Sequence, residues 1–334
     1  MKWFSSHKIF FIFLGRSALF SLGFLLILAA TNVYYRQRVM KNDFIFTSLN
    51  RFREENINPR IIFLGDSHAA LDIRSEFLDD GYYNFSAPSE GWREFSLRLR
   101  TALKLKKTIT HVIIPLDDHA FAPYRAHDVF FTNFLHFSDL DDIKAVFKPS
   151  AITLFKARVS NYLPLVSPSN RTLIRKVTGE DMYAFITRTK NIKSIVIDAW
   201  GGIVPTDERI WSEVPERERN EEIASRANKH FRKPLINEEL MATFEDFLAY
   251  CEKHGVKVIG VRYPVTTDYQ QAAKEHGEGL VQKRYQDFSF DGTLDYYHAF
   301  DKHQDYFRDP DHLNTKGAVV FSQMLMADLR KTVK

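Results

Sequence analysis

The chain has 334 residues and a formal net charge of +4, but the basic excess lies in residues 1–41, which contain six basic and no acidic residues. The other 293 residues carry 40 basic and 42 acidic side chains, a net charge of −2, so the composition gives no support for nucleic acid as a partner. An apolar content of 45% with 14% aromatics excludes a disordered chain, and the single cysteine, Cys251, excludes a disulfide framework and a cysteine-based zinc site.

The N-terminus contains an uncharged stretch of 19 residues, 17–35. As a helix this stretch spans about 28 Å, close to the thickness of the hydrocarbon core of a bilayer. We therefore predict a membrane anchor over residues 1–41. The alternative is a cleaved signal peptide ending at Ala30, but the apolar stretch is long for one, and Leu28 is unfavourable at that distance from the cleavage point. Three basic residues flank each side of the stretch, so the positive-inside rule gives no orientation.

Residues 42–58 are mostly polar and predict a linker with one helical turn, followed by a domain over 59–334. The domain begins with a short apolar run, 60–64, typical of a buried strand. Further strands are predicted at 82–85, 111–116, 256–261 and 294–300, and helices at 90–106, 240–254 and 315–332. This alternation predicts an α/β fold of three layers, a parallel sheet flanked by helices on both faces.

The alternation breaks between about residues 120 and 235, which we interpret as a large insertion. Within it we predict a helix over 139–147 with Ser138 as its N-cap, a strand at 195–197, and a charged surface helix within 213–232.

The first predicted strand ends in Gly65-Asp66-Ser67-His68. A serine on a tight turn at the carboxyl end of a buried strand lies where open α/β sheets bind their ligands. A helix beginning there would direct backbone N–H groups toward a developing oxyanion. The alternative is that Ser67 only caps this helix.

A second motif precedes the last predicted helix, where Asp309 and His312 stand three residues apart. A carboxylate at this spacing can accept a hydrogen bond from one imidazole nitrogen and leave the other nitrogen to accept the proton of a serine. The alternative is a simple capping loop, in which Asp and Asn are common.

Together the two motifs resemble those of the SGNH/GDSL hydrolase superfamily, which places a nucleophilic serine in a GDS turn and a DxxH pair before the last helix. The resemblance covers roughly residues 59–116 and 236–330. It implies that Ser67 is the nucleophile, His312 the general base and Asp309 the carboxylate that orients His312. Asp311 is the competing acid, with a less favourable position as the direct neighbour of His312.

The chain departs from this family in its oxyanion hole. The second conserved block has a glycine, for which this chain offers Ser89 or Gly91. The third block normally supplies an asparagine after the third strand, where this chain has Asp117, Asp118 and His119. Because a carboxylate accepts hydrogen bonds and does not donate them, either His119 replaces the missing donor or backbone N–H groups suffice. We therefore take Ser89, Gly91, His119 and Asp66 as the candidate oxyanion and substrate-binding residues.

No metal or cofactor is expected, because the remaining histidines are scattered along the sequence. We expect His68 to be a wall residue of the site. Trp200, Trp211, Tyr296 and Tyr297 would either stack on sugars or pack in the core.

The resemblance implies acyl transfer from an ester, either to water or to a sugar hydroxyl. An anchored domain of this kind is similar to the bacterial proteins of envelope polysaccharide O-acylation and teichoic-acid D-alanylation. These act outside the cytoplasmic membrane, often beside a membrane-bound O-acyltransferase. The first hypothesis is thus a single-pass, extracytoplasmic acyltransferase or esterase acting on an acylated envelope polysaccharide. The alternatives are a lipid or thioester hydrolase, or a non-catalytic polysaccharide-binding or assembly subunit.

Overall fold

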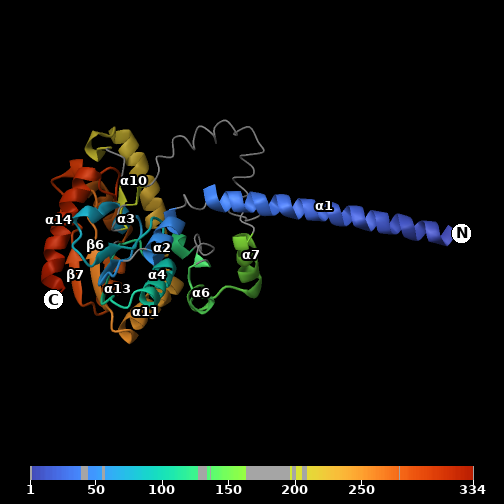
Figure 1. Cartoon of the computed structure of the whole chain (residues 1–334). Helices are drawn as coiled ribbons and strands as arrows, with labels where there is room; N and C mark the ends of the chain where they lie inside the picture. The colour runs from blue at the N-terminus through green and yellow to red at the C-terminus, as the bar shows by residue number, and fades with distance from the viewer. Residues whose placement is uncertain are drawn as a thin grey trace.

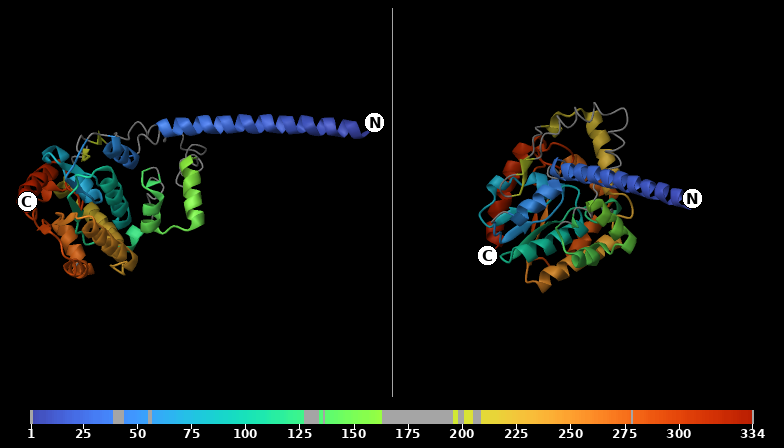
Figure 2. Two further views of the ribbon diagram at one scale, coloured as in Figure 1. Left: turned by 60° about the horizontal axis from the view of Figure 1, so that its bottom comes forward. Right: turned by 45° about the vertical axis from the view of Figure 1, so that its right-hand side comes forward.

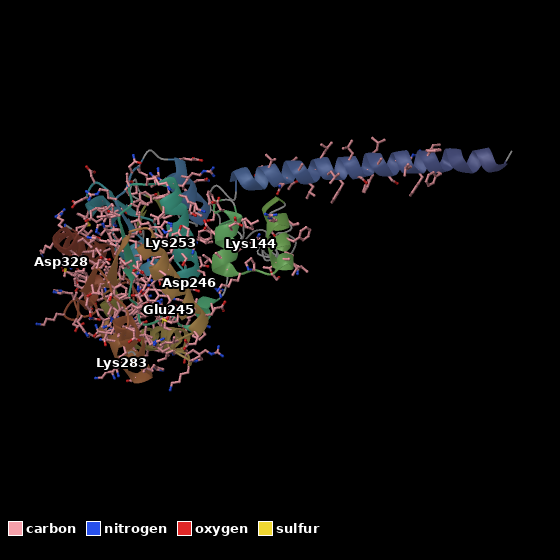
Figure 3. All side chains as sticks on the ribbon, turned by 90° about the horizontal axis from the view of Figure 1, so that it is seen from below. Lys144, Glu245, Asp246, Lys253, Lys283 and Asp328 are labelled. Carbon is pink, nitrogen blue, oxygen red and sulfur yellow. The ribbon has the colours of Figure 1, made fainter. Side chains whose placement is uncertain are left out.

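The computed structural model describes residues 2–38, 44–54, 57–126, 134–135, 137–162, 196–197, 201–204, 209–277 and 279–333. A long N-terminal helix, α1 (Lys2–Arg38), projects away from a layered α/β domain (Figure 1). Within α1, Phe10–Tyr34 has a mean hydropathy of 2.1 and no part of it is buried against the domain. Between Phe10 and Tyr34 most of its large apolar side chains are exposed (Figure 3). By length and composition this one helix of the described chain can cross a membrane, as the sequence predicts.

The domain is built on a five-stranded parallel sheet with the order β2-β1-β3-β6-β7. Its strands are β1 (Ile61–Phe63), β2 (Tyr82–Asn84), β3 (His111–Pro115), β6 (Lys257–Arg262) and β7 (Gly292–Asp295). Counted along the chain this is the doubly wound order 2-1-3-4-5, in which the strand order reverses between the first and third strands. The carboxyl ends of β1 and β3 therefore form the position where such sheets bind ligands.

The alternation of side chains along β1 and β3 divides the core into two layers. Ile62, Val112 and Ile114 face a cluster that includes Trp92 and Phe244. The second cluster lies on the other face of the sheet. It contains the strand residues that alternate with the first set, and residues from the apolar face of the last helix: Ile61, Phe63, Ile113, Phe321 and Leu325. Accordingly, α4 (Trp92–Leu105) and α11 (Glu238–Lys253) cover one face of the sheet and α14 (Thr315–Thr332) covers the other (Figures 1 and 2). The predicted three-layer α/β fold is confirmed.

The fifth strand is shorter than its prediction over 294–300 and begins two residues earlier. It ends because Asp295 Oδ1 accepts a hydrogen bond from the backbone N–H of Tyr297 at 2.9 Å, a turn that a short polar side chain stabilises. Two helices that the sequence did not predict, α12 (Thr267–His276) and α13 (Gly279–Gln286), follow β6. Their polar composition explains the missed prediction, since α12 buries little more than Tyr269 and two alanines.

The segment predicted as a linker contains α2 (Phe44–Glu54), about three turns of helix rather than one. Leu49 and Phe52 are buried, and the Phe52 ring stacks on Phe85 with centroids 4.2 Å apart. Through these two side chains α2 is packed against the domain, because an amphipathic helix beside the sheet can bury its apolar stripe.

The described parts of the insertion are mostly helical. They comprise η3 (Pro123–Ala126), α6 (Leu140–Phe147), α7 (Ala151–Tyr162), the antiparallel pair β4 (Val196–Ile197) and β5 (Ile203–Val204), η6 (Trp211–Glu213) and α10 (Glu216–His230). The prediction of Ser138 as a cap is wrong, because Asp139 occupies the N-cap position of α6 and Ser138 Oγ instead lies 2.8 Å from Thr101 Oγ1. Two short 3₁₀ turns, η2 (Ser75–Phe77) and η7 (Gln304–Tyr306), complete the domain.

A buried ion pair fixes the loop after β2 to α4. Arg98 donates to both carboxylate oxygens of Glu90, at 2.5 and 2.8 Å, and neither side chain is exposed to solvent. The guanidinium also lies 4.6 Å from the centroid of the Phe85 ring. An unpaired charge in this interior would destabilise the fold, so Glu90 must stay beside Arg98. The ion pair therefore restricts the backbone conformation around residues 85–91.

We expect Arg98→Met to lower the free energy of unfolding by about 3–5 kcal/mol, because it leaves the Glu90 carboxylate buried and unpaired. The double variant Glu90→Leu/Arg98→Met should recover much of this loss, since it removes both charges. Denaturant unfolding followed by circular dichroism measures both values. Equal destabilisation of the single and double variants would contradict this account of the pair.

Candidate active site

Ser67 is the first residue of the short helix α3 (Ser67–Asp72), directly after the turn that follows β1. Gly65 permits this turn, because a Cβ at that position would come within 2.6 Å of Ala69 Cβ. The N-cap of α3 is Asp66, whose Oδ1 accepts a hydrogen bond from the backbone N–H of His68 at 3.0 Å. The alternative in which Ser67 is only a cap is therefore wrong, and its hydroxyl is available to another partner.

That partner is His312, which lies in the loop before α14. His312 Nε2 is 2.8 Å from Ser67 Oγ, and His312 Nδ1 is 2.9 and 3.0 Å from the two carboxylate oxygens of Asp309. Asp309 also accepts the backbone N–H of His312 at 3.0 Å, so the spacing of three residues closes a local turn that orients the ring. The hydrogen-bonded chain expected from the two sequence motifs is present.

The loop that carries His312 is hydrogen-bonded to Asp72, the last residue of α3. The backbone N–H of Leu313 donates to Asp72 Oδ1 at 3.0 Å, and both groups are buried. Burial raises the pKa of Asp72 to about 7, against the opposing effect of the positive charges on His312 and His68. The segments that carry Ser67 and His312 are therefore held together by this hydrogen bond as well as by the contact between Ser67 and His312 themselves.

A second carboxylate also faces His312. Asp311 is 1% exposed, and its Oδ1 lies 3.3 Å from His312 Nδ1, slightly farther than Asp309. Asp309 keeps the shorter contacts, as the sequence argument expected, but Asp311 is not directed away from the ring. Although burial alone would lower the pKa of His312, Asp309 and Asp311 together raise it to about 9.

Asp311 belongs to a buried network centred on His68. His68 Nδ1 lies 3.0 Å from Asp117 Oδ2, and its Nε2 lies 3.6 Å from Asp311 Oδ2. Burial opposes its charged form, but Asp117 and Asp311 more than compensate and hold the pKa of His68 well above its usual value. His68 was expected as a wall residue of the site, and it lies buried between two carboxylates. Sequence reasoning had no signal for this, because its partners lie after β3 and before α14.

The candidate oxyanion donors occupy different environments. Gly91 is the N-cap of α4, and its backbone N–H donates to Glu94 Oε2 at 3.0 Å, so we do not carry it forward as a donor. Ser89 is exposed and adopts a left-handed backbone conformation with φ of 67°. His119 is 3% exposed, with its Nε2 3.5 Å from Asp66 Oδ2 and its ring stacked on His230 at 4.0 Å between centroids.

The charge states of these residues follow from their neighbours. Burial and then the nearby Arg125 lower the pKa of His119, which favours its neutral form. Burial would raise the pKa of Asp66, but the Arg125 guanidinium, His119 and His68 hold it well below its usual range. Arg125 contacts Asp66 directly and also donates to the Glu90 carbonyl oxygen at 2.6 Å. Asp66 thus caps α3 and links the loops after β1, β2 and β3.

The insertion contributes residues that the sequence analysis missed. From α10, Arg226 Nη1 lies 2.8 Å from Asp311 Oδ1, and its Nη2 lies 3.7 Å from Asp309 Oδ1. His230 Nδ1 lies 2.9 Å from the hydroxyl of Tyr269. The sequence predicted a charged surface helix here, and the spacing of four residues places Arg226 and His230 on the same face of it.

Two overlapping groups of side chains have the composition of metal ligands: His68 with Asp311 and His312, and His68 with Asp66 and Asp117. The contacts given above already pair each of these groups with another side chain, so we interpret them as an ion-pair network. A narrow cavity of about 10 Å³ beside His68 and Tyr263 has room for about one water molecule and is too small for a substrate.

The aromatic candidates that the structure describes are buried. Trp211, Tyr296 and Tyr297 are 1%, 6% and 2% exposed and pack in hydrophobic clusters, which favours the core alternative. Trp200 lies outside the described residues.

Comparisons with known proteins give a distant likeness in structure alone. No family model matches the chain, and no curated protein matches it. Among seven solved chains that match, one is a Bacteroides fragilis protein described as a candidate acylhydrolase, with 11% identity and a TM-score of 0.40 over 86% of this chain and 95% of the other. Another, from Streptococcus pneumoniae, is described as a candidate platelet activating factor, with 10% identity and a TM-score of 0.39 over 93% and 98% of the two chains. At these values neither structure carries information on the activity of this chain.

The histidine contacts lead to a prediction for the titration of His312. We expect Asp309→Asn to lower the pKa of His312 from its raised value of about 9, because a neutral amide no longer stabilises the imidazolium. Histidine-labelled NMR titration of the protein in detergent measures the change. Asp328→Asn, which removes a surface carboxylate bonded to Tyr296 and Lys331, is the matched control. An unchanged His312 titration in Asp309→Asn would show that Asp309 does not set its charge state.

Proposed function

We propose that this chain is a serine-dependent acyl-transfer enzyme, with Ser67 as nucleophile, His312 as general base and Asp309 as the carboxylate that orients the base. The observation that carries the proposal is the contact of 2.8 Å between Ser67 Oγ and His312 Nε2, with Asp309 on the other ring nitrogen. This is the arrangement in which a histidine can accept the serine proton while its tautomer is fixed.

In the proposed reaction, Ser67 Oγ attacks the carbonyl carbon of an acyl ester and transfers its proton to His312 Nε2. The resulting imidazolium then protonates the leaving alcohol, which departs and leaves the acyl group on Ser67. Water or a hydroxyl acceptor, deprotonated by His312, releases the acyl group in a second attack. Water gives hydrolysis, and a sugar hydroxyl gives O-acylation.

Oxyanion stabilisation in this proposal relies on the backbone N–H of Ser67, at the start of α3, together with Ser89 from the loop after β2. His119 would contribute only through Nδ1, because its Nε2 faces Asp66. The carboxylates of Asp117 and Asp118 cannot donate hydrogen bonds at the end of β3. Since loss of one oxyanion donor typically reduces a rate by about 10²–10³, we expect a slow enzyme.

We further propose that the substrate is an acylated cell-envelope polysaccharide, and that the domain works on the extracytoplasmic side of the membrane. The support is the apolar helix α1, long enough to span a bilayer, and the resemblance of an anchored domain with these motifs and a large insertion to the envelope acylation proteins. A membrane-bound O-acyltransferase is the partner expected if the reaction is transfer. A periplasmic phosphatase reporter fused to the C-terminus tests the orientation, and an inactive fusion would remove this substrate class.

A non-catalytic polysaccharide-binding or assembly subunit is the second candidate. The observation that favours it is the presence of Asp117 where the related enzymes have an amide donor, with its carboxylate engaged by His68. The two candidates differ in whether biological activity requires the Ser67 hydroxyl.

We expect Ser67→Ala and His312→Ala each to abolish labelling by a fluorophosphonate probe and to reduce cleavage of p-nitrophenyl acetate by at least about 10³-fold, because the two residues act as a unit. The double variant should be little worse than either single one. Ser96→Ala, at a buried serine whose hydroxyl donates to the Trp92 carbonyl, is the control and should keep full labelling. Labelling that survives in Ser67→Ala, or full biological activity of that variant, would favour the binding subunit.

The activity should also increase with pH. Because His312 must be neutral to accept the serine proton and its pKa is raised to about 9, we expect kcat/KM to rise about tenfold per pH unit below pH 9 and then to level off. Steady-state rates between pH 6 and 10 measure this profile. A profile that is flat across this range would exclude His312 as a base with the raised pKa.

A further inference from the structure

The helix α7 has an exposed apolar surface that the proposed chemistry does not use. Ile152 and Phe155 are 63% and 66% exposed, and they stand three residues apart on one helix face. The other large exposed apolar side chains of the described domain are single residues on separate elements: Leu105, Leu280 and Met324. The α7 pair is therefore the one place in the described domain where two such side chains share a surface.

The sequence of α7 gives this surface a basic border. At helical spacing, Ile152, Phe155 and Val159 form one stripe, and Lys156 and Arg158 lie on either side of it. Both cations are exposed, and α7 contains no acidic residue. The opposite face already packs on the domain through the partly buried Leu154 and the buried Ala157. The outward stripe is thus additional to the apolar face that holds α7 in place.

The position of α7 indicates what covers this stripe. In all three figures α7 lies on the side of the domain from which α1 extends, close to the C-terminal end of α1 (Figures 1, 2 and 3). The apolar segment of α1 ends at Tyr34, only four residues before that end, so a bilayer crossed by α1 would begin next to α7. Lys144, labelled in Figure 3, is another exposed cation on the same side, and Lys148 at the end of α6 is exposed as well.

We propose that α7 lies in the headgroup region of the membrane that α1 crosses, with Ile152 and Phe155 inserted at the acyl boundary and the flanking cations on anionic lipid headgroups. An apolar stripe with a basic border is the pattern of helices that lie in the plane of a membrane surface. Long basic side chains can cover apolar surface while their charges stay at the headgroups. The domain then has two attachments to the bilayer, α1 and α7, which together hold the Ser67 site in one orientation toward the membrane.

The test uses the full-length chain in nanodiscs that contain phosphatidylcholine and phosphatidylglycerol. Phe155→Cys is labelled with the fluorophore NBD, and selective labelling is possible because the native Cys251 is buried. Met324→Cys, on α14 at the far side of the domain from α1, is the matched control at an exposed apolar position. Spin-labelled lipids then report contact with the bilayer, and aqueous iodide reports contact with solvent.

We expect lipid quenching to be several-fold stronger at position 155 than at position 324, with the reverse order for iodide. Discs of phosphatidylcholine alone, or the change Lys156→Gln/Arg158→Gln, should reduce the lipid quenching at position 155. Iodide quenching equal to that of the control would overturn the proposal. Protection from both quenchers would also overturn it, because protein would then cover the stripe, and so would a chain that fails to float with lipid vesicles. Since no step uses Ser67, these results are independent of the proposed acyl chemistry.

Discussion

The buried imidazole ring of His68 connects the elements on which the candidate site depends. It lies between Asp117, at the end of β3, and Asp311, in the loop before α14, and it is itself the second residue of α3. A charge taken out of water costs several kcal/mol unless it is paired, so the three segments must come together for any of these groups to be buried. Arg125 likewise connects two segments, because it pairs with the Asp66 carboxylate and donates a hydrogen bond to the Glu90 carbonyl in the loop after β2. The geometry of Ser67 and His312 is a consequence of loops held together in this way.

The sheet decides where this network forms. Because β1 and β3 are neighbours and the strand order reverses between them, their carboxyl ends leave an open edge at which Ser67 and Asp117 both lie. The strands beneath are apolar and buried on both faces, so the polar groups are confined to this edge. The result is a rigid base of packed strands and a rim of loops in which His68 is paired with Asp117, and Asp66 with Arg125.

The insertion completes the site. Arg226 on α10 binds Asp311 and approaches Asp309, the two carboxylates that face His312. Its positive charge offsets the repulsion between these two acids, which are held close together around one ring. An insertion that supplies a counter-charge to the carboxylates of the site cannot be removed without changing the electrostatics of His312. The same insertion carries α7, with its exposed apolar stripe and basic border, on the side of the domain from which α1 extends.

Features that depend on interactions between residues close together in the chain could be predicted from the amino-acid sequence. They are the uncharged stretch of α1, the apolar strands, the turn at Gly65 and the three-residue spacing of Asp309 and His312, because hydrogen bonding and burial there follow from composition and period within a few residues. The pairing of Ser67 with His312 came from the resemblance of two motifs, and the folded chain supplied their 2.8 Å contact.

Other features of the site emerge only when the chain is folded. Asp66 rather than Ser67 caps α3, the Gly91 N–H is bonded to Glu94, and α2 packs on the domain. A network also joins the buried side chains of His68 and Asp311 to the partly buried Arg226. These features depend on the desolvation of groups from segments far apart in the chain. No local pattern in the sequence records which distant charge will be buried beside which, so their partners follow from tertiary packing alone.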